Sequence, residues 1–238
     1  MRKAFVTTGV VALAMLAGGA FVIGWERPPA EPEKPTGTAA TTALPSTTDV
    51  PVAPGEMILG DPDAPVTIVE YASLTCDHCG AFHRETLPRL KAEWLDTGRA
   101  RLVYRDFPLN APALTASMVA RCAAADAVAT SGAEAGRKRY FAFVSAFFQT
   151  QESWSHASDP VAALVRVAKL GGLGEERFRA CMGDKAVEDA VLTSRLDGER
   201  YGIASTPTFF INGQKLEGTQ PYAEFETLLN AVASGADG

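Results

Sequence analysis

The sequence predicts an α/β fold in which a β–α–β unit and a β–β–α unit are separated by a block of helices. Residues 66–71 alternate and are rich in β-branched side chains, as a strand is, and apolar groups at helical spacing follow from 76 to 96. Near the other end, a strand-like run at 208–211 precedes Asn212-Gly213, which is a strong hairpin signal. A β–α–β unit normally has parallel strands joined by a right-handed crossover.

The elements between these units are predicted from local patterns. The strand at 101–107 completes the β–α–β unit, and Pro221 begins a final helix. No strand-like run occurs between residue 107 and the hairpin. Apolar groups at helical spacing instead predict helices at 114–128, 140–148, 160–170, 175–182 and 186–201.

The composition is that of an ordinary globular protein. The chain has 238 residues, 47% of them hydrophobic and 21% charged, which suits one domain with an insertion. Its formal net charge is −6, and the residues before Glu56 include as many basic as acidic groups, so the excess negative charge lies on the part predicted to fold. We expect no nucleic-acid partner, because binding phosphates needs a basic footprint.

The N-terminus predicts export. Arg2 and Lys3 precede an uncharged apolar run over residues 4–24, and a basic start before such a run is typical of membrane insertion. About 20 residues can span a bilayer, while the small residues near the end of the run also suit a cleaved signal. Residues 1–24 are therefore expected to be a signal peptide or a membrane anchor, and both remain open.

The remaining chain divides by composition. Residues 25–55 are rich in Pro, Thr and Ala and have few large apolar side chains, so they cannot offset the entropy of becoming ordered. We interpret them as a linker. Residues 56–107 and 185–233 are expected to form one domain, into which a helical domain of residues 108–184 is inserted.

The predicted chemistry lies in Cys76-Asp77-His78-Cys79. Two thiols three residues apart on the first turn of a helix lie on one face, close enough to form a disulfide. The helix N-terminus stabilises negative charge and so lowers the pKa of the thiol placed there, which is Cys76. His78 can add a positive charge or a hydrogen bond to the same sulfur. A stabilised thiolate makes the disulfide more oxidising.

Two other interpretations of this cysteine pair are weaker. A zinc site would need a second pair at ligand spacing, which Cys122 and Cys181 do not offer. A structural disulfide across one helical turn closes a very small loop and stabilises little. We therefore expect a redox site with neither metal nor cofactor.

The pair also resembles a known family. Cys76-Asp77-His78-Cys79 after a strand, together with Ser205-Thr206-Pro207-Thr208-Phe209 before a hairpin, is similar to the DsbA-type thiol:disulfide oxidoreductases of the thioredoxin superfamily. The resemblance covers about residues 56–233 and implies a thioredoxin fold with an inserted helical domain. By this resemblance Cys76 is the attacking thiol and Cys79 the resolving thiol.

The resemblance also implies roles for other residues. Pro207 is expected to be a cis-proline beside the site, and the backbone of Thr206 is expected to pair with an extended substrate. Glu70 resembles the acidic group that thioredoxin-like proteins keep beneath the resolving cysteine, where it could accept the proton of Cys79. The alternative is that Glu70 points to solvent. The other histidines, His83 and His156, are expected on the surface.

Cys122 and Cys181 are left over in the helical block. In an oxidising compartment two such thiols usually pair, and closing a loop of about 60 residues would contribute roughly 4 kcal/mol. Some DsbA-like proteins carry such an extra pair, which favours a structural disulfide. The alternative is two separately buried free thiols.

These observations lead to one main hypothesis, an oxidase that donates the Cys76–Cys79 disulfide to reduced, newly exported polypeptides. The resemblance implies that a membrane quinone-linked oxidase recharges it, in the bacterial periplasm or on the extracytoplasmic side of a membrane. The alternatives are an isomerase or reductase of the same fold, or a non-enzymatic exported binding protein with a structural disulfide. Isomerases are often dimers, and because no dimerisation domain is visible we expect a monomer.

Overall fold

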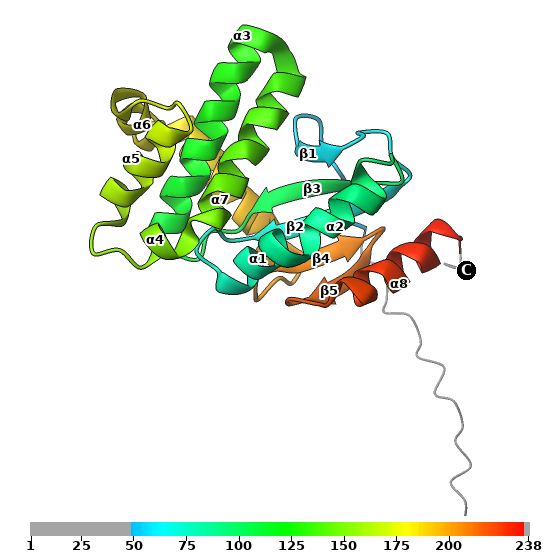
Figure 1. Cartoon of the computed structure of the whole chain (residues 1–238). Coiled ribbons are helices and arrows are strands. Elements are labelled where there is room, and N and C mark those ends of the chain that lie inside the picture. The colour runs from blue at the N-terminus through cyan, green and yellow to red at the C-terminus, as the bar shows by residue number, and fades with distance from the viewer. Residues whose placement is uncertain (1–48, 236–238) are drawn as a thin grey trace, which may run out of the picture. The chain divides into compact units, whose positions relative to one another are not determined.

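A computed structural model describes residues 49–235 (Figure 1). In this part of the chain one sheet has the strand order β1-β3-β2-β4-β5. β2 (Val66–Ala72) and β3 (Ala100–Asp106) are parallel neighbours. β1 (Met57–Gly60) runs antiparallel to β3, while β4 (Thr208–Ile211) and β5 (Gln214–Glu217) form an antiparallel hairpin beside β2. The predicted α/β class is confirmed as a thioredoxin fold with helices inserted between β3 and β4.

The helix that follows β2 is continuous but contains two wider π turns. Its segments are α1 (Asp77–Ala81), η1 (Phe82–Thr86), α2 (Leu87–Leu90) and η2 (Lys91–Leu95). Pro88 lies within it and cannot donate a backbone hydrogen bond, and π turns are a common way for a helix to absorb such an interruption. The predicted helix over 76–96 is therefore present, with a local distortion that its apolar spacing did not indicate.

The inserted helices form a layer of their own. The first of them bends at Gly132, whose φ of +85° lies in the region that favours glycine. Two separately predicted helical runs therefore belong to one folded-back element (Figure 1). The inserted elements are α3 (Ala111–Gln149), α4 (Gln151–Ser155), α5 (Pro160–Leu170), α6 (Glu175–Met182) and α7 (Lys185–Arg200).

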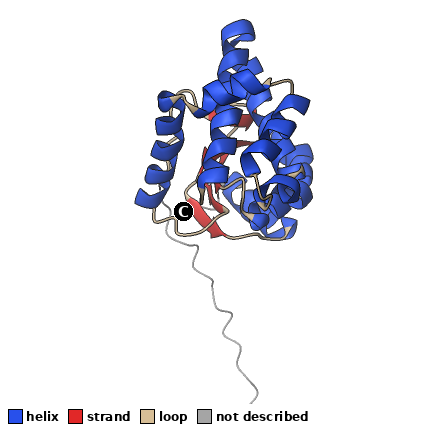
Figure 2. Ribbon diagram, turned by 90° about the vertical axis from the view of Figure 1, so that its left-hand side faces the viewer, coloured by secondary structure: helices blue, strands red, loops and turns tan. Residues whose placement is uncertain are grey.

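Helices lie on both sides of the strands (Figure 2). On one face, Phe82 packs with Phe209 of β4 and Phe225 of α8 (Tyr222–Ala233), with ring centroids 4.7–5.4 Å apart. On the other face, Gly198 of α7 lies so close to Tyr71 and Phe107 that an added Cβ would come within 2.9 Å of each ring. Both faces of the sheet are therefore buried, and the redox motif follows the end of a buried central strand.

The residues before β1 contact the sheet. Val50 is buried, and the carbonyl of Pro51 accepts a hydrogen bond of 2.6 Å from Nη2 of Arg105 on β3. Arg105 also forms an ion pair with Glu56. The last residues of the predicted linker, 49–55, thus lie against the folded part, and β1 follows them where no strand was predicted.

Other predicted boundaries concern parts of the chain that the structure leaves undescribed. The signal peptide or anchor of residues 1–24 and the linker up to residue 48 lie outside the described residues. Within residues 49–235, no helix is long and apolar enough to cross a membrane.

Candidate active site

Cys76 occupies the N-cap position of α1, where the turn after β2 becomes helix. Its backbone is extended (φ −84°, ψ 120°), and its N–H donates to the carbonyl of Ser73 at 3.0 Å. The carbonyl of Cys76 accepts the N–H of Gly80 at 3.0 Å, which is the first helical hydrogen bond. The half-buried Cys76 thiol donates to the carbonyl of Thr206 at 3.2 Å. The strand, the turn and the helix start together place the sulfur beside free backbone N–H groups.

The two thiols of the motif have opposite electrostatic environments. The pKa of Cys76 is lowered to about 6, chiefly because the Cys79 thiol donates a hydrogen bond to its sulfur. Partial burial opposes this change. Hydrogen bonds from the Thr206 side chain and from the backbone N–H groups of Cys79 and His78 lower the pKa of Cys76 further. Burial raises the pKa of Cys79 well above its ordinary value, and the charges of Cys76 and Glu70 raise it more. At neutral pH Cys76 is therefore largely a thiolate and Cys79 a thiol.

His78 contributes through its backbone. Its N–H lowers the pKa of Cys76, and its carbonyl accepts a hydrogen bond of 3.1 Å from Oγ1 of Thr219. The imidazole is exposed and makes no hydrogen bond to any residue that the structure describes. The hydrogen bond that the ring could give to the Cys76 sulfur is therefore not formed here, and an effect of its positive charge stays a prediction.

Glu70 and His83 form a buried pair on the β2 side of the helix. Glu70 is fully buried, and its two carboxylate oxygens lie 3.0 and 3.1 Å from Nε2 of His83. His83 is only 7% exposed and stacks on Phe148 of α3, with ring centroids 4.1 Å apart. The expectation that His83 lies on the surface is wrong. It follows Cys79 by four residues, so helical spacing places both on the sheet-facing side, and that spacing was the available signal. His156 is exposed, as expected.

The loop before β4 completes the site. Because Thr208 pairs with Tyr71, the residues that precede β4 lie beside those that follow β2. The Thr206–Pro207 peptide bond is cis. Oγ1 of Thr206 is buried without a hydrogen-bond partner among the described residues, so it is available to donate to a Cys76 thiolate.

The remaining cysteines form a disulfide inside the insertion. Cys122 of α3 is bonded to Cys181 of α6, and their Cα atoms are 6.0 Å apart. Both residues are fully buried, and 59 positions separate them in the sequence. The bond links two helices that do not follow each other in the chain, whereas Cys76 and Cys79 are in the dithiol form.

Two buried polar residues near the site were not predicted. Gln151, the first residue of α4, donates from Nε2 to the carbonyls of Leu74 and Cys76, both at 2.9 Å. Tyr104, opposite Glu70 in the sheet, has a buried hydroxyl without a hydrogen-bond partner in residues 49–235. Neither position carries a local sequence signal, because each reaches the site only through packing between distant segments.

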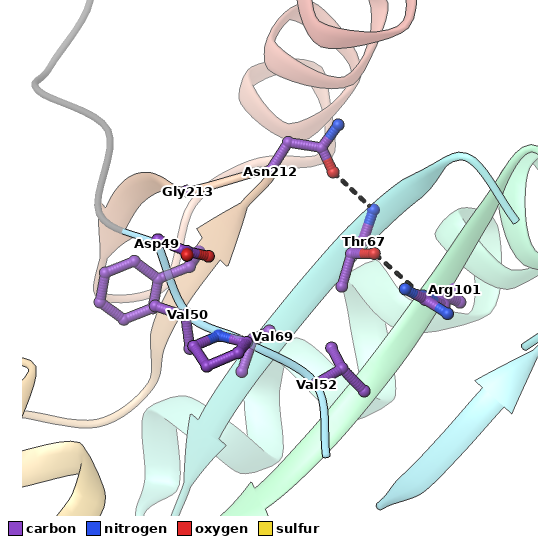
Figure 3. Close-up of a pocket in the computed structure, with 10 residues that line it drawn as sticks. Asp49, Val50, Val52, Thr67, Val69, Arg101, Asn212 and Gly213 are labelled. Atoms are coloured by element: carbon purple, nitrogen blue, oxygen red, sulfur yellow. Dashed lines mark hydrogen bonds between the residues drawn. The ribbon is translucent and has the colours of Figure 1, made fainter. Parts of the chain in front are cut away.

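A separate cavity of about 470 Å³ lies between the segment before β1 and the sheet (Figure 3). Three of its lining residues are joined by hydrogen bonds. Asn212 Oδ1 accepts the N–H of Thr67 at 2.8 Å, and Nε of Arg101 donates to the Thr67 hydroxyl at 2.9 Å. Neither Cys76 nor Cys79 lines it, so it is distinct from the redox motif.

Comparison with known proteins identifies the family. A family model described as Thioredoxin matches residues 52–231. The crystal structure of alpha-DsbA1 from Wolbachia pipientis is 32% identical with a TM-score of 0.68, and the match covers 78% of this chain and 94% of that one. The chain therefore belongs to the thioredoxin family, in its DsbA-type branch.

More distant relatives agree with this placement. A protein from Rickettsia typhi, whose name describes a protein-disulfide oxidoreductase, is 28% identical over 177 residues, which is 74% of this chain and 62% of the relative. This chain thus matches less than two thirds of that relative's length. BdbD from Bacillus subtilis, at 17% identity, shares the fold with a TM-score of 0.63 over 76% of this chain and 94% of its own.

Proposed function

We propose that this chain is an exported thiol:disulfide oxidase that donates the Cys76–Cys79 disulfide to reduced, newly exported polypeptides. The observation that carries this proposal is the asymmetry between the two thiols. Because the pKa of Cys76 is lowered to about 6, the reduced form is stabilised as a thiolate at neutral pH. Stabilising the dithiol form makes the disulfide a stronger oxidant.

The difference in burial between the two cysteines supports a particular order of steps. A client thiolate attacks the half-buried Cys76 sulfur, and the electrons of the broken S–S bond pass to the fully buried Cys79 sulfur. This forms a mixed disulfide between the client and Cys76. A second client thiolate then attacks the client sulfur of that bond, and Cys76 leaves as a thiolate. The client loses two electrons and gains a disulfide, while the protein becomes a dithiol.

Substrate binding is assigned to the loop before β4. The carbonyl of Thr206 lies 3.2 Å from the Cys76 sulfur, so a polypeptide that pairs with the Thr206 backbone would place its own cysteine beside the attacked atom. Pro207 has no backbone N–H to compete for that pairing. Main-chain pairing is independent of side-chain identity, which suits an enzyme with many clients.

The Glu70–His83 pair is assigned to proton transfer at Cys79. Cys79 becomes a thiolate when it leaves. Its burial and the nearby charge of Glu70 both raise its pKa, so the thiolate tends to take up a proton. A proton delivered by way of the buried pair would neutralise it, and the same pair would take the proton back when Cys79 attacks during recharging. His83 acts here as a positioning residue, since its Nε2 holds both Glu70 oxygens.

The N-terminal sequence and the chemistry support a proposed cellular setting. A basic start and an apolar run over residues 4–24 support export to the bacterial periplasm or to the outer face of a membrane, with or without anchoring. Net oxidation of clients requires an acceptor for their electrons, for which we propose a membrane quinone-linked oxidase. The protein is proposed to act as a monomer.

Mixing the oxidised protein with an equal amount of a reduced, unfolded polypeptide tests the oxidase. Without glutathione, we expect about one client disulfide per molecule and two new thiols on the protein, measured by alkylation and mass analysis. An isomerase would instead act in its reduced form, and would convert clients with wrongly paired cysteines to the native pairing. A Cys76–Cys79 disulfide that resists mild reduction and transfers nothing would identify a binding protein and overturn the proposal.

The pH dependence of the redox potential should change slope near pH 6. Below that value reduction takes up two protons, and above it only one, because Cys76 stays ionised. Since a tenfold change in equilibrium constant is about 30 mV for two electrons, the slope should fall from about 60 to about 30 mV per pH unit. Equilibration with glutathione buffers from pH 5 to 8 measures it.

The same ionisation has a consequence for stability. The pKa of Cys76 is lower in the folded reduced protein than in the unfolded one, so its thiolate stabilises the reduced fold most fully above the ordinary thiol pKa. That contribution is lost as the pH falls through about 6.

The redox measurement can contradict this ionisation. If the redox potential changes by about 60 mV per pH unit across the whole range from pH 5 to 8, Cys76 is not a thiolate at neutral pH.

A further inference from the structure

Gln151 connects the helical insertion to the start of the redox helix. It is only 2% exposed, and its Nε2 donates to the carbonyls of Leu74 and Cys76, both at 2.9 Å. A primary amide nitrogen carries two hydrogens, so one side chain satisfies both carbonyls. Leu74 and Cys76 lie on either side of Thr75, so the amide fixes the turn between β2 and α1 in which Cys76 is held.

Gly80 provides a second, independent indication. A Cβ at this position would lie 2.3 Å from Oε1 of Gln151 and 2.6 Å from Nη1 of Arg84. Its φ is not in the left-handed region, so the backbone there does not require glycine. Glycine in a helix costs about 1 kcal/mol relative to alanine. What it permits at this site is the close approach of the Gln151 amide to the helix that follows Cys76.

The Cys76 carbonyl connects the insertion to the first turn of the redox helix. The Cys76 carbonyl receives the Gln151 amide and the N–H of Gly80, which is the first hydrogen bond of the helix. Arg84, one helical turn after Gly80, donates from Nη1 to the carbonyl of Phe148 at 2.9 Å. The end of α3 and the start of α4 therefore hold both the turn and the helix.

We propose that Gln151 is a positioning residue for the redox reaction, which holds the Cys76 turn so that its sulfur stays aligned with the N–H groups of His78 and Cys79. The inserted helices thereby help to stabilise the thiolate and to set the redox potential. This rests on the proposed role of Cys76 and Cys79 as the redox couple. Without the amide, the turn can rotate and the sulfur loses part of its hydrogen bonding.

The test compares Gln151→Ala with Gln149→Ala, which removes an exposed glutamine two residues earlier. Thiolate absorbance gives the Cys76 pKa, and equilibration with glutathione gives the potential. For Gln151→Ala we expect a pKa about one unit higher and an equilibrium constant shifted about tenfold, or about 30 mV, toward a more reducing couple. Gln149→Ala should leave both unchanged.

Gly80→Ala reaches the same contact from the other side. The added methyl displaces the ends of the Gln151 and Arg84 side chains, so this chain should fold and show a shift in the same direction. In a chain that already carries Gln151→Ala, the Gly80→Ala change should shift the Cys76 pKa by less than it does alone, because only Arg84 is then left to be displaced. Additive shifts would show that Gly80 acts separately from Gln151.

Two results are distinguishable failures. An acid-shifted Cys76 pKa that is unchanged in both Gln151→Ala and Gly80→Ala would overturn the positioning role and leave the oxidase intact. An ordinary Cys76 pKa in the unaltered protein would overturn both proposals. If Gln151→Ala does not fold, an unchanged Cys76 pKa in Gly80→Ala overturns the positioning role, since that chain retains every original side chain.

Discussion

Replacing Cys76 by serine should reduce oxidation of a reduced client to the rate seen without the protein. The attacked sulfur is then missing, and Cys79 cannot take its place because it is fully buried and its pKa is raised well above the ordinary value. The measurement is the loss of client thiols with time after mixing with the oxidised protein. The fold should survive, since serine preserves the shape of the N-cap residue and is favoured there.

The matched control replaces the other cysteine pair by the same residue. A chain with Cys122→Ser and Cys181→Ser should still oxidise clients, although losing a disulfide that closes a long loop lowers its stability by roughly 4 kcal/mol. The companion change Cys79→Ala removes the partner of Cys76, so it is tested on a client that already carries a disulfide. The Cys76 thiolate should attack that disulfide, release one client thiol and remain in a mixed disulfide, because the resolving thiol is absent. Adducts on Cys76→Ser, with none on Cys79→Ala, would reverse the two roles.

Replacing Glu70 by glutamine should slow disulfide transfer by about 100-fold, at the lower end of what proton transfer by a positioned side chain contributes. Glutamine keeps the size of the side chain and can still hydrogen-bond to His83, so the buried pair stays satisfied while the carboxylate is lost. Stopped-flow measurement of the transfer rate between pH 5 and 8 checks this, and the effect should appear in the pH profile as well as in the rate.

Glu93→Gln provides the control, because it removes a partly exposed carboxylate from the same helix without touching the buried pair. Its rate and pH profile should match those of the unaltered protein. Equal rates in Glu70→Gln and Glu93→Gln would mean that solvent exchanges the Cys79 proton, and would remove Glu70 from the mechanism. A loss of stability in Glu70→Gln with an unchanged rate would assign the residue to the core alone.

Much of the fold could be predicted because its signals are short-range. The alternation of residues 66–71, the helical spacing after Cys76 and the Asn212-Gly213 turn each specify an element from neighbouring residues. β1 was missed because four apolar and small residues have no diagnostic period, and only pairing with β3 makes them a strand. Residues 49–55 were assigned to a linker by composition, although Arg105 holds them against the sheet.

The sequence by itself determined the class of chemistry, because the reactivity of Cys76 begins with its place at a helix N-terminus, which neighbouring residues specify. Only the tertiary structure decided which groups tune it. Thr206 and Gln151 meet the Cys76 residue from positions 130 and 75 residues away, and the packing of the helix on the sheet pairs His83 with Glu70. Such contacts depend on how strands and helices pack, and packing between distant segments leaves no periodic mark in the chain.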